Sequence, residues 1–420
     1  MKNTILNSLS IALFLGLATM LTAQNSDLYM YGQVTSVDNE IYTGQIRWDR
    51  EEAYWFDMFN ATKLENDNLK YLSKDEMKDL TGSSCGNKKK TSWSGWNAWN
   101  NNSSYSSSRS MIHTFACQFG EIQSIDIKGR NDVRVALKNG ERLAFEGGSN
   151  DIGAKIQVVD TELGLVKLDW DRVAKVEFMN SPRDMASHFG EPLYGVVETD
   201  YGTYTGFVQW DHDERMALDI LNGSSDDGEM EVAFHKIKSI KKVKNSADVT
   251  FHSGRTINLE GTNDVNCSNK GIVVYHPDFG RADIPWSAFE SVVFTEVPTN
   301  QSKSYDNYKG HTEIRGSVVT NTGKTLNGIL VYDLDESRRL EVLDGKKDNV
   351  EFFIPFSNIQ SITPLNKKES EVVLVDNTKI VFEDTVDVDE RNSGLLICSD
   401  SKKCEYVRWE DVEKVNLKQL

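Results

Sequence analysis

Three acidic turns carry the residue types that could do chemistry together. They read Asp-Arg-Glu-Glu at 49–52, Asp-His-Asp-Glu at 211–214 and Asp-Leu-Asp-Glu at 333–336. Carboxylate oxygens suit Ca²⁺, but its shell needs roughly six to eight oxygens, more than one turn supplies. Because Asp also bonds its own backbone in tight turns, we expect ordinary solvated turns and no metal site. The recurring residues Asp151, Asp264 and Asp387 carry the same expectation.

Histidines and nucleophile motifs give no catalytic constellation. The seven His residues are scattered, and none recurs at an equivalent position along the chain. The sequence has no His-Glu-x-x-His, Gly-x-Ser-x-Gly or glycine-rich phosphate loop. His212 and His235 are expected to be solvated turn residues. The sequence therefore predicts a protein without catalytic residues, metal or cofactor, and a hydrolase of unrecognised type is the alternative.

Five cysteines could form disulfides if the chain is exported. Cys398 and Cys404 bracket a short polar loop that would set them opposite each other in a hairpin, at a bridgeable spacing. Cys85 and Cys117 bracket an insertion and are predicted to form a second bridge. Cys267 is left over, and we expect it to be a small buried hydrophobic residue.

The insertion is the one strong departure from an otherwise repeating pattern. From the aromatic residue of the acidic turn to the next recurring Phe, the first copy of the pattern takes 71 residues (Trp48 to Phe119). The other two copies take 24 residues each. It contains Trp93, Trp96 and Trp99 within Ser-, Asn- and Gly-rich sequence. Such composition favours a disordered or loosely folded loop. Exposed Trp rings would also suit a sugar or a protein partner, so these three residues are the candidate ligand-binding site.

Three tandem repeats must position these features. Each repeat opens on Gly-x-Val, reaches Gly-x3-aromatic-Asp, continues to Phe-x2-Ile-x-Ser-Ile and closes on Trp-x2-apolar-x2-Val. Equivalent Phe and Trp residues lie 115 to 123 positions apart. The predicted boundaries are 28–179, 193–297 and 313–418, with the insertion at about 62–114 of the first repeat.

Strand signals dominate within each repeat, and both halves of a repeat end on the same aromatic-x2-apolar-x2-aliphatic pattern. Residues 204–210 and 249–259 alternate apolar and polar side chains, as half-buried strands do. Turn pairs such as Asn139-Gly140 and Ser253-Gly254 separate these runs. The predicted class is all-β, in six half-units.

Four strands, a one-turn corner carrying an aromatic residue and a short fifth strand resemble an SH3-like or Sm-like small barrel. The second repeat, through Asn263-Asp264-Val265, Gly280 and residues 284–294, resembles small-barrel repeats of exported bacterial envelope proteins. The third repeat lacks the equivalent Asn. The resemblance implies that each repeat is a pair of small barrels, and it implies no reaction. A six-bladed β-propeller is the alternative, although the aromatic-Asp pair recurs once per repeat rather than once per blade.

The first 23 residues have the pattern of a removable signal peptide. Lys2 precedes a short apolar run at 11–20, and small or aliphatic residues end it before Gln24. A net charge of −17 disfavours nucleic acid and anionic membrane surfaces as partners. We therefore expect an exported, soluble, non-enzymatic binding or scaffold module of the periplasm or cell exterior. Its expected partner is an unknown envelope protein or a glycan, and a glycan-binding protein that uses the Trp-rich loop is the alternative.

Overall fold

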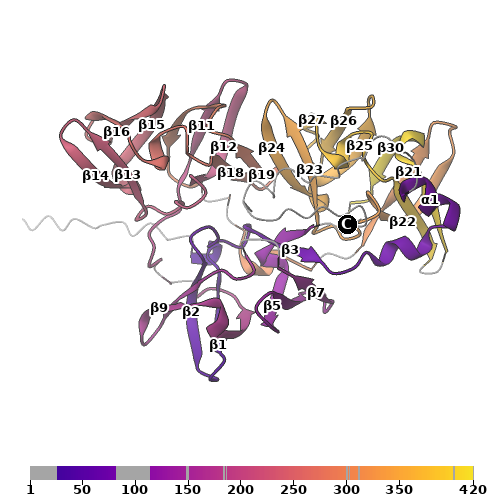
Figure 1. The fold of residues 1–420 in the computed structure, drawn as a ribbon, viewed down its shortest axis with the longest axis horizontal. Coiled ribbons are helices and arrows are strands. Elements are labelled where there is room, and N and C mark those ends of the chain that lie inside the picture. The colour runs from indigo at the N-terminus through magenta and orange to yellow at the C-terminus, as the bar shows by residue number, and fades with distance from the viewer. Residues whose placement is uncertain are drawn as a thin grey trace, which may run out of the picture.

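Antiparallel strands make up nearly all the regular structure of the described residues, which confirms the all-β prediction. The computed structural model describes residues 26–81, 114–147, 151–182, 185, 187–298, 301, 303–310, 313–400 and 403–419. The three repeats lie in a triangle, with the first below the second and third in Figure 1. Within the described ranges, no helix is long and apolar enough to cross a membrane.

The first repeat forms one ten-stranded sheet in the order β4-β3-β7-β6-β5-β10-β1-β2-β8-β9. Its strands are β1 (Tyr31–Ser36), β2 (Ile41–Trp48), β3 (Met58–Lys63), β4 (Thr114–Gln118), β5 (Ile122–Ile127), β6 (Asp132–Leu137), β7 (Arg142–Glu146), β8 (Ile156–Asp160), β9 (Gly164–Leu168) and β10 (Val173–Phe178). Single 3-10 turns at Phe119–Glu121 and Trp170–Arg172 form the expected aromatic corners.

The second and third repeats contain the same ten elements in the same chain order. In the second repeat these are β11 (Tyr194–Thr199), β12 (Gly202–Trp210), β13 (Ile220–Ser225), β14 (Gly228–Ala233), β15 (Ile237–Val243), β16 (Ser246–Phe251), β17 (Thr256–Leu259), β18 (Ile272–His276), β19 (Gly280–Ile284) and β20 (Phe289–Phe294). In the third they are β21 (Ile314–Thr320), β22 (Thr325–Val331), β23 (Val342–Lys347), β24 (Val350–Pro355), β25 (Ile359–Pro364), β26 (Glu369–Leu374), β27 (Lys379–Glu383), β28 (Leu395–Asp400), β29 (Lys403–Val407) and β30 (Val412–Leu417). Pairing of β19 with β24 joins the two repeats.

The recurring glycines mark the places where strands approach most closely. Gly44, Gly206 and Gly328 each lie opposite the opening glycine of their own repeat. A Cβ on Gly44 would stand 1.8 Å from the carbonyl oxygen of Val159 on β8, and equivalent contacts of 2.2 and 2.3 Å occur in the other two repeats. No side chain fits there, so the sequence motif is a requirement of this sheet crossing.

The expectation of separate paired barrels is not met by the described strands, whose sheets are open. Strands of the first half of a repeat take partners from the second half: β1 pairs with β10, β2 with β8 and β3 with β7. A half-unit therefore does not complete its own sheet, and the two halves fold as one unit. Six separate propeller blades are not formed either, since the sheets run across the half-units and from the second repeat into the third.

The hydrophobic cores follow this arrangement. One cluster fills the first repeat, and one continuous cluster spans the second and third, with all six corner aromatic residues buried. The connection between the second and third repeats packs into the first: Tyr305 and Tyr308 join its core, and the Tyr305 hydroxyl donates to the Ile122 carbonyl at 2.8 Å.

The start of the insertion extends from the first repeat to the third. A 3-10 helix, η2 (Asp67–Tyr71), and the α-helix α1 (Lys74–Thr81) extend from β3 to the third repeat, where α1 lies beyond β22 (Figure 1). Leu72 and Leu80 pack there against a cluster that includes Leu396. The first and third repeats are therefore joined twice: the segment before the third repeat packs into the first, and the start of the insertion packs on the third.

Candidate functional site

The acidic turns of the second and third repeats are mostly buried, contrary to the expectation that they are solvated, whereas in the first turn Glu52 is buried and Asp49 and Arg50 are exposed. Asp211 and Asp333 are each 1% exposed, Glu52 is 5% exposed, and His212, also expected to be solvated, is 4% exposed. His235 is exposed as expected. Burial lowers the pKa of His212 well below its ordinary value. Another repeat contacts each turn. The Asp211 and Asp333 carboxylates also accept from backbone N–H groups of their own repeats, so a turn pattern alone does not encode the burial.

The recurring Asp residues support the turns from inside each repeat. The backbone carbonyl of Asp151 accepts from the Trp48 indole at 2.9 Å, and its carboxylate accepts from the Asn60 amide N–H at 2.6 Å. Asp264 and Asp387 repeat both contacts, with a Tyr hydroxyl replacing the indole in the third repeat. These residues fix the turn to the following hairpin, so their recurrence has a structural cause.

A second set of carboxylates joins one repeat to the next. Asp57, Asp219 and Glu341 each accept two backbone N–H groups within their own repeat. Each also pairs with a cation from another repeat: Asp57 with Arg215 at 2.6 Å, Asp219 with Arg47 at 2.8 Å and Glu341 with Lys63 at 2.7 Å. The equivalent carboxylate of each repeat therefore forms an ion pair with another repeat.

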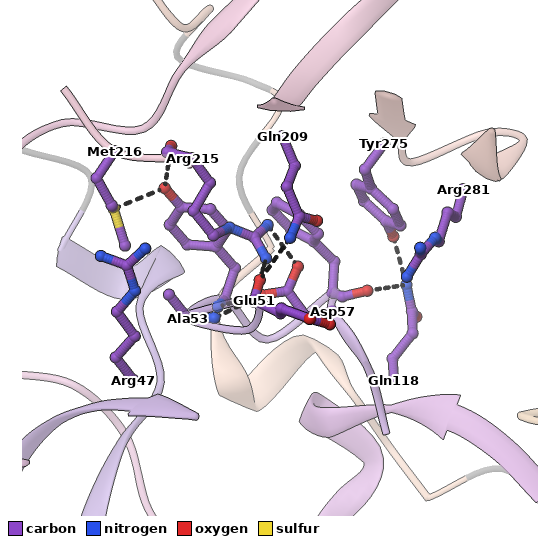
Figure 2. Close-up of polar contacts among 12 residues, drawn as sticks. Arg47, Glu51, Ala53, Asp57, Gln118, Gln209, Arg215, Met216, Tyr275 and Arg281 are labelled. Atoms are coloured by element: carbon purple, nitrogen blue, oxygen red, sulfur yellow. Dashed lines mark hydrogen bonds and ion pairs between the residues drawn. The ribbon is translucent and has the colours of Figure 1, made fainter. Parts of the chain in front are cut away.

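The contact between the first and second repeats is rich in polar side chains, and Figure 2 shows them converging from both sides. The Arg215 guanidinium lies 4.4 Å from the Tyr54 ring centroid and donates to the Glu51 carbonyl. Gln209 donates to the same carbonyl at 3.2 Å. At the other end, Gln118 donates to the Tyr275 hydroxyl. The side chains of this cluster are used to bind one repeat to the other.

Buried carboxyls in this region favour their neutral form. Burial and the Asp213 carboxylate raise the pKa of Glu51 to about 7, and burial and Asp264 raise that of Glu214 to about 9. Burial and Asp151 hold the pKa of Glu52 well above its usual value. Paired carboxyls with shifted pKa values are typical of acid–base sites. The cavity beside Glu52, Asp57 and Arg215 has a volume of only about 20 Å³, however, so it holds about one water and no substrate.

An open cleft of about 360 Å³ lies between the first and third repeats. Residues 63–68, Phe115 and residues 142–145 form one side, and Asp335, Ser337 and Arg338 form the other. Its base is fixed by contacts between the repeats: Lys63 pairs with Asp335 at 2.9 Å, and Arg338 forms two bonds of 2.6 and 2.9 Å to Glu141. The remaining surface mixes apolar, amide and charged groups, which suits a ligand with both polar and apolar parts.

The predicted site residues have different outcomes. The Cys398–Cys404 disulfide is confirmed, with the two residues opposite each other in the β28–β29 hairpin. Cys117 is instead a free thiol, wholly buried in the core of the first repeat, because its side chain points inward from β4. Its expected partner Cys85 lies outside the described residues, as do Trp93, Trp96 and Trp99. Cys267, expected to be buried, is exposed.

Several residues that join the repeats were missed, although part of the signal was present. Asp57, Asp219 and Glu341 each lie nine positions after the aromatic residue of the acidic turn. Their cationic partners Arg47 and Arg215 occupy unrelated places in their repeats, so no spacing rule identifies them. Among the described residues, no group of three or more His, Cys, Asp or Glu side chains is arranged to hold a metal ion.

Comparison with known proteins yields no family. No family model and no curated protein matches the sequence. A streptogramin B lyase structure is 12% identical over 71% of this chain and 94% of its own, with a TM-score of 0.12. A catalytically inactive virginiamycin B lyase from Staphylococcus aureus with quinupristin is 10% identical over 71% of this chain and 96% of its own, with a TM-score of 0.13. At these TM-scores the likeness supports neither a fold nor an activity.

Proposed function

We propose that this chain is an exported, non-enzymatic repeat protein that acts as a binding or scaffold module in the cell envelope. The observation that carries the proposal is the cleft between the first and third repeats, which has walls from both and therefore exists only when they are assembled. The buried ion pairs support a scaffold role, since they use charged groups to fix the repeats relative to one another. The Cys398–Cys404 disulfide supports an oxidising location, the periplasm or the cell exterior.

The cleft offers a direct test of the binding role. Leu64 is 44% exposed on the first-repeat wall of the cleft, and Arg142 is exposed on β7 in the same wall. The double variant Leu64→Asp/Arg142→Glu should fold normally, because neither side chain is buried. Arg130→Glu, on the exposed turn between β5 and β6, is the matched control. The measurement is quantitative capture of cross-linked envelope proteins and surface polysaccharide by each purified variant.

A binding partner that uses the cleft should be lost with the double variant and retained with the Arg130→Glu control. The same partners in the same amounts for wild type and the double variant would show that the cleft is not the binding surface. Unchanged thermal unfolding of the three proteins would establish that any loss of capture is local.

A glycan-binding role for Trp93, Trp96 and Trp99 is the second candidate. It is favoured by where the insertion is attached: α1 ends on the third repeat, and β4 begins beside the cleft, where Phe115 forms part of the wall. Trp fluorescence titrated with cell-wall and surface polysaccharide fragments should then shift in the wild type. Changing all three Trp residues to Ala should abolish binding in a parallel pull-down, because aromatic residues dominate such contacts. No shift with any fragment would reject this candidate.

A further inference from the structure

The strands at the edges of the three repeats are equivalent, and one pair of them already forms a contact between repeats. In the second and third repeats, β19 pairs with β24 in antiparallel register, with Arg281 opposite Phe353, Ala282 opposite Phe352 and Asp283 opposite Glu351. The equivalents of β19 are β9 and β29, and the equivalents of β24 are β4 and β14. The fold therefore contains three edges of each kind, and one of each is used in this contact.

Two further edges are covered by other parts of the chain. On β4, Ala116 is buried in a cluster with Phe353 of the third repeat. On β29, Cys404 and Tyr406 lie in the cluster that also holds Leu80 of α1. This leaves β9, which pairs only with β8 among the described strands, and β14, which pairs only with β13. One edge of each kind thus remains open.

The two open edges complement each other when placed in the register of β19 and β24. Lys167 of β9 then lies opposite Glu229 of β14, and Val166 lies opposite Met230. Lys167 and Glu229 are exposed on the outer face, whereas Val166 and Met230 are half-buried and pack against the cores of their own repeats. Opposite charges would meet on one face and apolar side chains on the other, which is the arrangement that stabilises cross-strand pairs.

We propose that copies of this chain associate head to tail, with β9 of one copy adding to β14 of the next as a β-strand pair. The occupant of each open edge is a second copy because the chain already joins its own repeats through the same kind of edge. The contact also covers part of the β8–β9 hairpin, where Leu163 is 69% exposed and Leu165 is 37% exposed. It goes beyond the binding function and does not depend on the cleft.

The contact is heterologous, since two different edges meet, and a pair of copies still has one free edge of each kind, one on each copy. Such a contact propagates into an open chain of copies, or into a ring if the rotation closes. A single pair of two-fold-related copies is not expected. The assembly should therefore grow in steps of one copy as the protein concentration rises.

Sedimentation velocity of the full mature protein over a wide concentration range tests this association. Reversing one charge, as Lys167→Glu or Glu229→Lys, should weaken it roughly five- to tenfold, because cross-strand attraction becomes repulsion. The double variant Lys167→Glu/Glu229→Lys should restore association to near the wild-type level. Lys238→Glu, an exposed reversal on β15, is the matched control and should leave association unchanged. All three substituted positions are exposed, and thermal unfolding will verify that the folds are intact.

Charges on an edge strand can also serve to prevent pairing. If Lys167 and Glu229 have that role, the wild type should not associate. A single monomeric species at every concentration would overturn the proposal. So would single reversals that associate as the wild type does, or a double variant that fails to recover, because the two edges would then not be partners.

Discussion

Removing the Arg215 guanidinium should be among the most destabilising single changes in this protein. The Arg215 and Asp57 side chains are only 4% and 7% exposed, and their charged atoms are 2.6 Å apart. In Arg215→Met the Asp57 carboxylate keeps its two backbone N–H donors but loses its cation. Leaving one partner of a buried pair without the other costs about 3 to 5 kcal/mol. Tyr54, which stacks on Arg215, also loses that contact.

The same structure supplies a control and a rescue. Arg172 and Asp38 form an ion pair whose side chains are 51% and 65% exposed, so Arg172→Ala should cost at most about 1 kcal/mol. Replacing both buried partners, as Arg215→Met/Asp57→Leu, should recover part of the loss, because the cost comes largely from the charge left unpaired.

Urea unfolding followed by Trp fluorescence measures these differences as shifts of the midpoint, compared at equal slope. Equal midpoints for Arg215→Met and Arg172→Ala would refute the reasoning, because the buried pair would then hold the repeats no more firmly than a surface pair. A double variant less stable than Arg215→Met would refute the assignment of the cost to the unpaired carboxylate.

Three further predictions concern pH, the disulfide and calcium. Because the pKa of Glu214 rises from 4.5 to about 9 on folding, the folded chain binds more protons, so its contribution to stability is present at pH 4.5 and is lost as pH rises towards 9. Thermal melts across this window should decline less steeply for Glu214→Gln, and parallel profiles would contradict the shift. Cys404→Ser should cost at most about 2 to 3 kcal/mol, because the closed loop is short, and non-reducing peptide mapping should find Cys398 joined to Cys404 in the wild type. Millimolar Ca²⁺ should leave the melting temperature unchanged, and a rise of several degrees that Asp211→Asn abolishes would show that the acidic turns bind the ion.

The local architecture could be predicted from the sequence because it depends on near neighbours in the chain. The corner residues Phe119 and Trp170 follow a fixed spacing, and the structure places both in 3-10 turns before a short strand. The Cys398–Cys404 bridge was predictable for the same reason, since a short hairpin brings the two residues together. The sequence pattern was sufficient to predict a contact wherever the two contacting residues lie within one hairpin or one corner.

Features that depend on contacts between repeats could not be predicted in this way. The acidic turn around Asp211 has the composition of a solvated turn, but Arg47 of the first repeat packs on it, and Lys270 of its own repeat donates to the Asp211 carboxylate. Half-unit barrels were expected because four strands, an aromatic corner and a short fifth strand resemble a small barrel, but the pairing of β2 with β8 crosses the division between the half-units. Cys117 was assigned by its position at the end of the insertion, whereas strand alternation points its thiol into the core.

The mutual crossing of the first and third repeats changes how this chain should unfold. In most tandem-repeat proteins each repeat touches only its sequence neighbours, so stability adds up along one dimension and terminal repeats can be removed singly. Here α1 rests on the third repeat while Tyr305 rests in the core of the first, and Lys63 pairs with Glu341 between them. Deleting the third repeat would thus strip an interface from each of the other two. The three repeats therefore form a cooperative ring of contacts rather than a modular array, and a truncated chain of two repeats should lose stability in both that remain.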